Sequence, residues 1–404
     1  MTWTIEKDLD VIRGNFPILE KCVYLISNSL GAVPQTAALE LERYYKLWAE
    51  WGVEAWEKEW WEMARKVGDS IAVLLNAPPD TVTMMPNATT AQWMALSSRF
   101  RDDGGNRKKV VVSEKDFPST IYAIRSIAET MGWTVNMIPG SSHSFVDSDE
   151  IIQHLDDETL IVSTSHVFFK SAAIQDVKSI CRKAREVGAL SIIDGYHAPG
   201  VIEVDVQDIG TDFYIGGCLK WLCGGPGNAF LYVRPGLSSE VEPGLTGWFA
   251  HKDPFNFSTD MEYMHGSYRF MSGTPCIPCF YTAKAGLEII HNIGIDQIRK
   301  NSLFLTDKIF DEALARGYGI YTPEDKEKRA GAVSIDVPHG GAVQQVLSQR
   351  KYIVDFRKGG IKEPDTIRVA PHFYNRPEEI KMFFSEIDDI VASGAYKEAS
   401  PDGE

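Results

Sequence analysis

Three residues between 191 and 227 have side chains that can carry out nucleophilic and acid–base chemistry. Asp194 ends an apolar run, His197 follows three residues later, and Lys220 stands 26 residues after Asp194 among glycines. A lysine amine can attack a carbonyl carbon and form a Schiff base, and an aspartate can hold a protonated ring nitrogen. This combination indicates covalent catalysis through a lysine.

Pyridoxal 5'-phosphate (PLP) is the most common carbonyl partner of such a lysine, and it requires three further groups. A carboxylate must face the ring nitrogen, donors must bind the phosphate, and a flat side chain must cover the ring. Asp194 is the candidate for the first role, and Phe117, just after a predicted strand, for the third. The segment PNATTAQ (86–92) offers Thr89 and Thr90 at a predicted helix start, where free N–H groups bind an anion.

The elements that must position these residues alternate between strands and helices. Apolar residues at 177, 180, 184 and 187 predict a helix over 176–189. Such alternation indicates an α/β fold, with a mainly parallel sheet sandwiched by helices and ligands beyond the carboxyl ends of the strands. Asp194 and Lys220 both lie near such ends. Five short apolar runs predict the buried strands: 109–113, 160–165, 190–194, 212–216 and 229–233.

Helical patterns precede and follow this core. Residues 36–52 and 59–76 predict helices before it, and residues 280–294 and 298–317 predict two long helices after it. Beyond them, strands near 331–338, 352–355 and 366–371 and helices near 341–350 and 377–392 predict a smaller α+β domain. We therefore divide the chain into an N-terminal segment that packs with the small domain (1–20), a large PLP-binding domain (21–275), a small C-terminal domain (276–395) and a disordered tail (396–404).

Composition argues against several classes of protein. The 404 residues carry a net charge of -15, which disfavours nucleic acid and anionic membranes as partners. The N-terminus lacks the pattern of a signal peptide, and no stretch is apolar enough to span a membrane. Six scattered cysteines are typical of reduced thiols in the cytoplasm, where we expect the protein. Cys276 and Cys279 form a lone CxxC motif with no second pair, so we expect no metal site.

Seven motifs in order resemble the class V aminotransferase-fold enzymes, which are fold type I PLP enzymes. Within them the chain looks most like kynureninase and secondarily like isopenicillin N epimerase-like proteins, over about residues 20–390. DGYHAPG (194–200) and KWLCGGPG (220–227) are more similar to the epimerase branch. The other motifs are YLISNSLGAVP (24–34), DFPSTIYAI (116–124), LTGWFAH (245–251), RFMSGTPCI (269–277) and IRVAPHFYN (367–375).

The resemblance implies a role for each candidate residue around the cofactor. Lys220 would carry PLP as an aldimine and then move protons, and Asp194 would pair with the ring nitrogen. Phe117 would stack on the ring, and His197 would lie near its hydroxyl. Thr89 and Thr90 would bind the phosphate.

The resemblance also implies a substrate site and a partner. Arg368 would bind the carboxylate of an amino-acid substrate, while Asn28 and Ser29 would line its amino-acid end. Thr274 and Trp248 would reach the phosphate in the neighbouring subunit. The enzyme would therefore be a homodimer with shared active sites.

Two positions depart from the kynureninase pattern. Leu219 stands where kynureninases have a tyrosine that contacts the phosphate, and Thr120 stands where they have an aspartate. A phosphate contact and a carboxylate are then missing, and L-kynurenine should be a poor substrate. We expect the aromatic residues Phe168, Phe169, Trp248 and Phe249 to line the site for another sizeable side chain. No cysteine follows Cys279, which disfavours the cysteine desulfurase branch.

Three functional hypotheses remain open. The first is a PLP-dependent lyase or hydrolase of amino-acid metabolism that cleaves a substrate side chain as kynureninases do. The second is a transferase or epimerase: a class V aminotransferase or an amino-acid epimerase. The third is a PLP-fold binding protein without catalysis, which the joint presence of Lys220, Asp194 and Arg368 disfavours. Structural alternatives also stand: Asp194 as a helix cap, His197 as a structural histidine, and Arg368 paired with a structural carboxylate.

Overall fold

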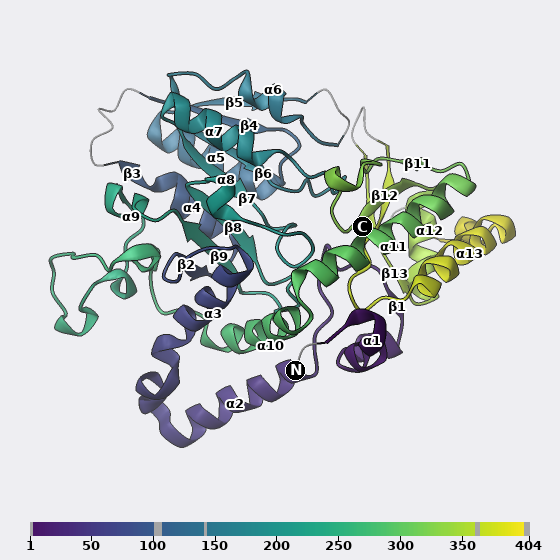
Figure 1. Cartoon of the computed structure of the whole chain (residues 1–404), viewed down its shortest axis with the longest axis horizontal. Coiled ribbons are helices and arrows are strands. Elements are labelled where there is room, and N and C mark those ends of the chain that lie inside the picture. Colours follow the sequence, from purple (N-terminus) through teal and green to yellow (C-terminus); the bar gives the residue numbers. More distant parts are fainter. Residues whose placement is uncertain (1–2, 101–106, 141–143, 360–363, 400–404) are drawn as a thin grey trace.

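A seven-stranded sheet forms the centre of the computed structural model, which describes residues 3–100, 107–140, 144–359 and 364–399 (Figure 1). The strand order is β2-β9-β8-β7-β6-β4-β5, and β9 runs antiparallel to both of its neighbours, whereas β5, β4, β6, β7 and β8 are parallel. The strands are β2 (Val82–Met85), β4 (Lys109–Ser113), β5 (Thr134–Ile138), β6 (Thr159–Ser165), β7 (Leu190–Asp194), β8 (Phe213–Gly217) and β9 (Ala229–Val233).

Helices cover both faces of this sheet, which confirms the predicted fold class. Successive residues of β7 belong to opposite cores: Ile193 packs in the core that includes α3, and Ile192 in the core that includes α5. Strands buried on both faces read as unbroken apolar runs, which is why the sequence located them. The helices around this sheet are α3 (Trp61–Leu74), α4 (Ala88–Ser97), α5 (Pro118–Met131), α6 (Ser148–Ile152), α7 (Val177–Val187), α8 (Val206–Ile209) and α9 (Leu237–Glu240).

A second, antiparallel sheet lies toward the C-terminus with the order β11-β12-β15-β14. Two short pairings complete the strands: β1 (Val23–Tyr24) with β13 (Tyr352–Ile353), and β3 (Arg99–Phe100) with β10 (Val241–Glu242). None of the described helices is long and apolar enough to cross a membrane. The remaining elements here are β11 (Gly319–Ile320), β12 (Val333–Asp336), β14 (Asp355–Arg357), β15 (Thr366–Val369), α11 (Ile295–Ala315), α12 (Gly340–Gln349) and α13 (Pro377–Ser393).

Two details bear on the expected division of the chain. Helix α10 (Ile277–Ile293), assigned to the small domain, packs against α2 (Thr36–Trp51) and α3, so the boundary at 275/276 stays a prediction. The tail expected to be disordered from residue 396 instead begins within a 3-10 helix, Ala395–Glu398. The Tyr396 ring stacks on His339 at 4.2 Å, and this contact orders the segment. Residues 400–404 lie outside the described part.

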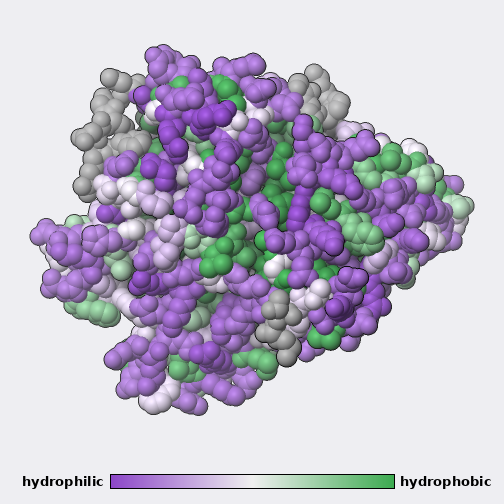
Figure 2. Space-filling model, viewed as in Figure 1, coloured by the Kyte–Doolittle hydropathy of each residue, from purple (hydrophilic) through white to green (hydrophobic). Residues whose placement is uncertain are grey.

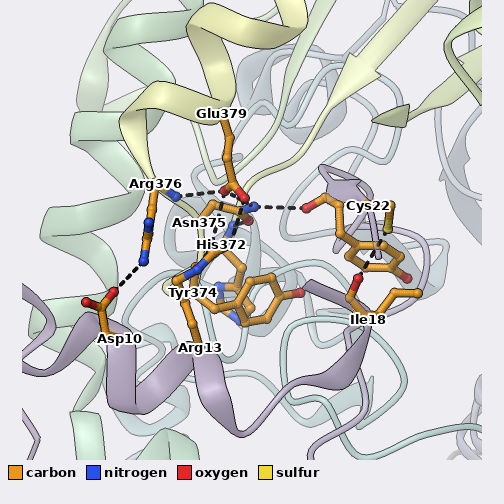
Figure 3. Close-up of polar contacts among 10 residues, drawn as sticks. Asp10, Arg13, Ile18, Cys22, His372, Tyr374, Asn375, Arg376 and Glu379 are labelled. Carbon is orange, nitrogen blue, oxygen red and sulfur yellow. Dashed lines mark hydrogen bonds and ion pairs between the residues drawn. The ribbon is translucent and has the colours of Figure 1, made fainter. Parts of the chain in front are cut away.

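The N-terminal helix α1 (Ile5–Gly14) is joined to the C-terminal region by a largely buried ion pair between Arg13 and Glu379 (Figure 3). Arg13 donates to Glu379 at 3.0 Å and to the Tyr374 carbonyl at 2.6 Å. Glu379 also accepts from the Asn375 amide and the Arg376 backbone N–H. One carboxylate therefore holds the first helix, the start of α13 and the segment after β15 together.

We expect Glu379→Ala to lower the free energy of unfolding by about 2 to 4 kcal/mol, because it leaves the Arg13 charge buried without its partner. The matched control is Asp10→Ala. Asp10 pairs with Arg376, but the Asp10 side chain is 84% exposed. Its loss should stay within about 1 kcal/mol. Urea unfolding followed by circular dichroism measures both variants, and equal losses would contradict the assignment.

Candidate active site

Two neighbouring parallel strands place Asp194 and Lys220 at the same edge of the large sheet. Asp194 is the last residue of β7, and Lys220 stands in the turn after β8. Strand β8 ends in Gly217, where a Cβ would lie 2.4 Å from the Tyr196 ring. Glycine at this position therefore lets the turn that follows Asp194 and the turn that carries Lys220 pack closely. Asp194 leads into a turn rather than a helix, so it caps no helix.

A cavity of about 210 Å³ opens at this edge. Figure 2 shows hydrophobic residues gathered in the middle of one face, between the part of the molecule that holds the large sheet and the part that holds the second sheet. The structure brings eight of the residues singled out in the sequence together here. The lining comprises Ala88, Thr89, Phe117, Ser119, Thr120, Ser165, Val167, Phe169, Asp194, Tyr196, His197, Leu219 and Lys220.

The amine of Lys220 is enclosed by aromatic rings and by His197. Its Nζ lies 2.6 Å from His197 Nε2, 4.8 Å from the centre of the Tyr196 ring and 5.9 Å from that of Phe117. Burial, together with the charge of Arg368, lowers the pKa of Lys220 to about 7. Burial also holds the pKa of His197 well below its usual value, as does the charge of Lys220. Near neutral pH this site can therefore hold an uncharged amine beside an uncharged imidazole.

Asp194 is held by two hydrogen bonds. Its Oδ1 accepts the Tyr196 backbone N–H at 2.9 Å, and its Oδ2 accepts the Thr120 hydroxyl at 3.2 Å. Burial raises the pKa of Asp194, and the Tyr196 N–H and the charge of Lys220 oppose that rise. A buried carboxyl in this state would gain from a cationic ligand such as a protonated ring nitrogen.

A second carboxyl near Asp194 was missed from the sequence. Asp116 is buried and accepts the backbone N–H and the hydroxyl of Ser165 at 2.7 and 2.6 Å. Burial, with a contribution from Asp194, raises its pKa to about 7 against the effect of its hydrogen bonds. Asp116 is not among the described residues that line the cavity, so the expectation that Thr120 leaves the cofactor without a nearby carboxylate stays a prediction. Asp116 directly precedes Phe117 in the motif DFPSTIYAI (116–124), so the sequence could have indicated this carboxyl.

Two further residues also escaped notice, Tyr196 in the cavity lining and His166 outside it. Tyr196 stands within the quoted segment DGYHAPG, and its ring lies over the Lys220 amine. His166 is buried, and its Nδ1 lies 2.8 Å from the Tyr214 hydroxyl. The backbone N–H of His166 donates to the Asp194 carbonyl, which ties β6 to the end of β7.

The segment with Asn28 and Ser29 packs against the backbone of the lysine turn. The Gly31 N–H donates to the Leu219 carbonyl at 3.0 Å, and a Cβ on Gly31 would lie 2.0 Å from the Lys220 carbonyl oxygen. The Asn28 side chain is buried, and neither of its polar atoms has a hydrogen-bond partner within the described residues. An unpaired buried amide is costly unless a ligand satisfies it.

Arg368 lies behind the wall of the cavity rather than in its described lining. Its Nε donates to Asp355 at 2.7 Å, its Nη2 also contacts Asp355, and its Nη1 donates to the Phe169 carbonyl. Arg357, which the sequence reasoning missed, donates to Asp355 at 3.1 Å. The guanidinium of Arg368, which we predict to bind the substrate carboxylate, is therefore already paired with the Asp355 carboxylate.

Thr89 and Thr90 differ at the start of α4. Thr89 lines the cavity, whereas the Thr90 hydroxyl donates to the Asn87 side chain at 3.1 Å. The same Asn87 oxygen accepts the Thr90 backbone N–H and caps the helix. Thr90 is therefore engaged in capping, although its predicted phosphate contact stays untested.

Trp248 and Thr274 line a separate cavity of about 770 Å³. It is bordered by part of the aromatic segment 47–61, where the Trp61 and Phe249 rings lie 5.0 Å apart. Neither Trp248 nor Thr274 is among the described residues of the same chain that line the Lys220 cavity. Phe168, which we expected to line the site, is buried in the core beneath α7 because its neighbour Phe169 takes the cavity-facing position.

The cavity residues fit the groups that PLP requires. Lys220 supplies an amine whose pKa burial lowers to about 7, and Asp194 supplies a carboxyl at the end of the neighbouring parallel strand. Phe117 presents a ring that is partly exposed beside them, and Thr89 stands at the start of a helix whose N–H groups can bind an anion. No group of three or more metal-binding side chains occurs among the described residues.

Solved structures share this fold. The apo structure of a cysteine desulfurase from Thermococcus onnurineus NA1 superposes with a TM-score of 0.83 and 21% identity, covering 95% of this chain and 98% of that one. The cystine C-S lyase C-DES, in complex with its product cysteine persulfide, gives a TM-score of 0.82 and 21% identity over 93% and 99%. Another C-DES structure carries glycine covalently linked to its PLP cofactor.

Sequence relatives are more similar. A kynureninase from Pseudomonas fluorescens is 29% identical over 367 residues, 87% of this chain and 86% of that protein. The uncharacterized aminotransferase YcbU from Bacillus subtilis is 30% identical over 388 residues, 95% of this chain and 98% of that protein. The model of the family Aminotransferase class-V matches residues 23–383. The chain therefore belongs to the aminotransferase class-V family and is an enzyme that uses pyridoxal 5'-phosphate.

Proposed function

We propose that this enzyme cleaves the side chain of an α-amino acid, as kynureninases do, on a substrate other than kynurenine. The observation that carries the proposal is the cavity itself: Leu219 presents an apolar side chain beside the Lys220–His197 pair and Asp194. The kynureninase from Pseudomonas fluorescens supports the reaction class. The relative YcbU favours transamination within the second hypothesis, which also includes amino-acid epimerisation.

In this proposal three side chains act on protons and charge. When bound, PLP supplies an electron sink for charge that develops at the substrate Cα. Lys220, whose pKa of about 7 makes the uncharged amine available near neutral pH, accepts the α-proton, and His197 at 2.6 Å orients the amine. Asp194, fixed by Thr120 and Tyr196, holds the protonated ring nitrogen. Thr89, Thr90 and Phe117 hold the rest of the cofactor.

The substrate would be held by groups on two sides of the lysine turn. The unpaired Asn28 amide, with Ser29, supports a polar contact at the amino-acid end. Arg368 would bind the substrate carboxylate through N–H groups that Asp355 leaves free. Val167, Phe169 and Leu219 leave an apolar wall for the side chain. We also propose that the enzyme works in the cytoplasm, which its six free cysteines support.

The first prediction concerns the lysine. PLP added to the apoenzyme should attach covalently to Lys220, and borohydride reduction should fix it to the peptide that contains this residue. Because the pKa of Lys220 is lowered to about 7, the nucleophilic uncharged form grows as pH rises, so attachment should accelerate from about pH 6 to about pH 8. Lys178→Ala, at an exposed lysine, is the matched control. Label on another peptide would contradict the site.

The second prediction concerns Asp194. Asp194→Asn should leave the fold intact but lower turnover by roughly two to four decades, because a charge-assisted pair in a dry site is lost. Thr120→Val removes only a hydrogen bond that orients Asp194, so its loss should be about tenfold. Steady-state kinetics and circular dichroism measure both variants. Near-normal turnover of Asp194→Asn would rule out the proposed role.

We propose that the enzyme is a homodimer in which Trp248 and Thr274 complete the partner's active site. Exposed apolar residues on α2, the following turn and the loop 245–264 support this arrangement. Val53 is 82% exposed and Phe257 is 74% exposed, and contiguous apolar surface of this kind marks interfaces. Helix α2 runs along one edge of the molecule, where a second copy can reach it (Figure 1).

The third prediction follows from this surface. Phe257→Asp should shift the protein toward monomers and lower activity together, since it places a charge in an apolar interface. Leu314→Asp is the control, because Leu314 is 60% exposed on α11. Sedimentation velocity at micromolar concentration, with activity measured in parallel, decides the matter. A fully active monomer would refute the shared site.

The fourth prediction tests the proposed substrate. L-kynurenine should be turned over with an efficiency below about 10⁴ per molar per second, the lower end of the ordinary enzyme range. Leu219 offers no group that relays protons, and such assistance is typically worth about two to four decades. Leu219→Tyr should therefore raise activity on L-kynurenine at least about tenfold.

Assays with L-kynurenine and 3-hydroxykynurenine measure this directly. A screen of other amino acids, with products followed by mass spectrometry, separates the candidate reactions. A keto acid would favour transamination, a D-amino acid would favour epimerisation, and a shortened amino acid would support side-chain cleavage. High efficiency with kynurenine in the unmodified enzyme would overturn the proposed substrate.

A further inference from the structure

Two cysteines meet at the start of α10, outside the site described above. Cys276 is the N-cap of this helix and Cys279 stands in its first turn, with their Sγ atoms 2.8 Å apart. Cys276 is exposed and Cys279 is half-buried. A disulfide requires the two sulfurs to approach to about 2.05 Å, so little movement separates the observed thiols from that bond.

The backbone of the turn holds the two thiols in this arrangement. The Cys279 N–H donates to the Cys276 carbonyl at 3.1 Å, which closes the turn. Pro278 lies between them at the start of the helix, where its fixed φ suits the first turn. The sulfurs are therefore brought together by local structure and do not depend on a flexible loop.

The same turn is joined to the loop that follows Lys220. The Asn228 amide donates to the Cys279 carbonyl at 2.6 Å and to the Gly224 carbonyl at 3.1 Å. The Thr282 hydroxyl lies 2.8 Å from both carbonyl oxygens. A Cβ on Gly227 would lie 2.5 Å from the Cys279 sulfur, so the thiol touches this loop directly.

We propose that Cys276 and Cys279 form a reversible dithiol–disulfide couple whose oxidant is a low-molecular-weight disulfide. The Cys276 sulfur attacks one sulfur of the oxidant, forming a mixed disulfide and releasing the first thiol. The Cys279 sulfur then attacks the Cys276 sulfur and releases the second thiol. Two protein thiols are oxidised to one disulfide, one small disulfide is reduced to two thiols, and both protons end on those thiols.

Exposure and acidity assign the order of the two steps. Burial and the hydrogen bond with Cys276 raise the pKa of the Cys279 thiol to about 12. Because the thiolate is the attacking species, Cys279 is the weaker first nucleophile and suits the resolving role. Cys181, Cys218 and Cys223 are buried, so they are less accessible to a small oxidant than the exposed Cys276.

The test treats the PLP-loaded enzyme with oxidised glutathione and digests it with trypsin without reduction. The peptide 270–284 contains Cys276 and Cys279 and no other cysteine. We expect this peptide to lose the mass of two hydrogen atoms and to regain it after dithiothreitol. Cys279→Ser should instead retain glutathione at Cys276, because the resolving thiol is gone.

Cys22→Ser is the matched control, since Cys22 is the other partly exposed thiol away from this turn. It should form the disulfide as the unmodified enzyme does. A peptide 270–284 that stays reduced, or that keeps glutathione while both cysteines are present, would overturn the proposal.

A second measurement addresses the link to the lysine loop and rests on the proposed function. Formation of the disulfide should change the visible absorption band of the bound cofactor, and dithiothreitol should restore it. An unchanged band in enzyme whose peptide is fully oxidised would overturn the link to Lys220. The peptide mass is read independently of the cofactor, so failure of the proposed function and failure of the redox couple are distinguishable.

Discussion

The chemistry of the site depends on an uncharged amine at Lys220, and the surrounding residues lower the pKa of that amine. A lysine in water has a pKa of about 10.4 and is charged at neutral pH, so it cannot attack a carbonyl carbon. Burial lowers the pKa to about 7. That burial comes from segments far apart in the chain: the segment around Gly31 closes over the lysine backbone, and the rings of Phe117 and Tyr196 approach the amine.

Two neighbouring charged groups act on the Lys220 amine in opposite directions. Asp194 favours the charged amine, whereas Arg368 disfavours it. A guanidinium has five N–H donors, and the bonds to Asp355 and Phe169 use three of them. One hydrogen on each terminal nitrogen is left, which suffices for a carboxylate fork. Asp355 can therefore orient Arg368 without preventing the proposed substrate contact.

The sequence located the sheet and the residues at its edge but not the contacts between distant segments. Strands β4, β7 and β9 were found at their observed bounds because they are buried on both faces. Asp116 and Tyr196 were overlooked inside quoted motifs, since their roles depend on Ser165 and Lys220, which only the fold brings near. The ion pair between Arg368 and Asp355 was also not predicted, because the two residues lie on different strands that only the fold brings together. Trp248 and Thr274 lie apart from the lysine because, as we propose, they serve a second copy.

The position of Leu219 explains how one fold can support different reactions. Its carbonyl is fixed by the Gly31 N–H, while its side chain faces the cavity. A change of side chain at 219 therefore alters the chemistry available beside Lys220 without altering the backbone that buries the amine. The same holds for Thr120, which reaches Asp194 from the first turn of α5. Proteins named for kynurenine cleavage, transamination and desulfuration can thus share one scaffold, because what differs among such reactions lies in the few side chains that line the cavity.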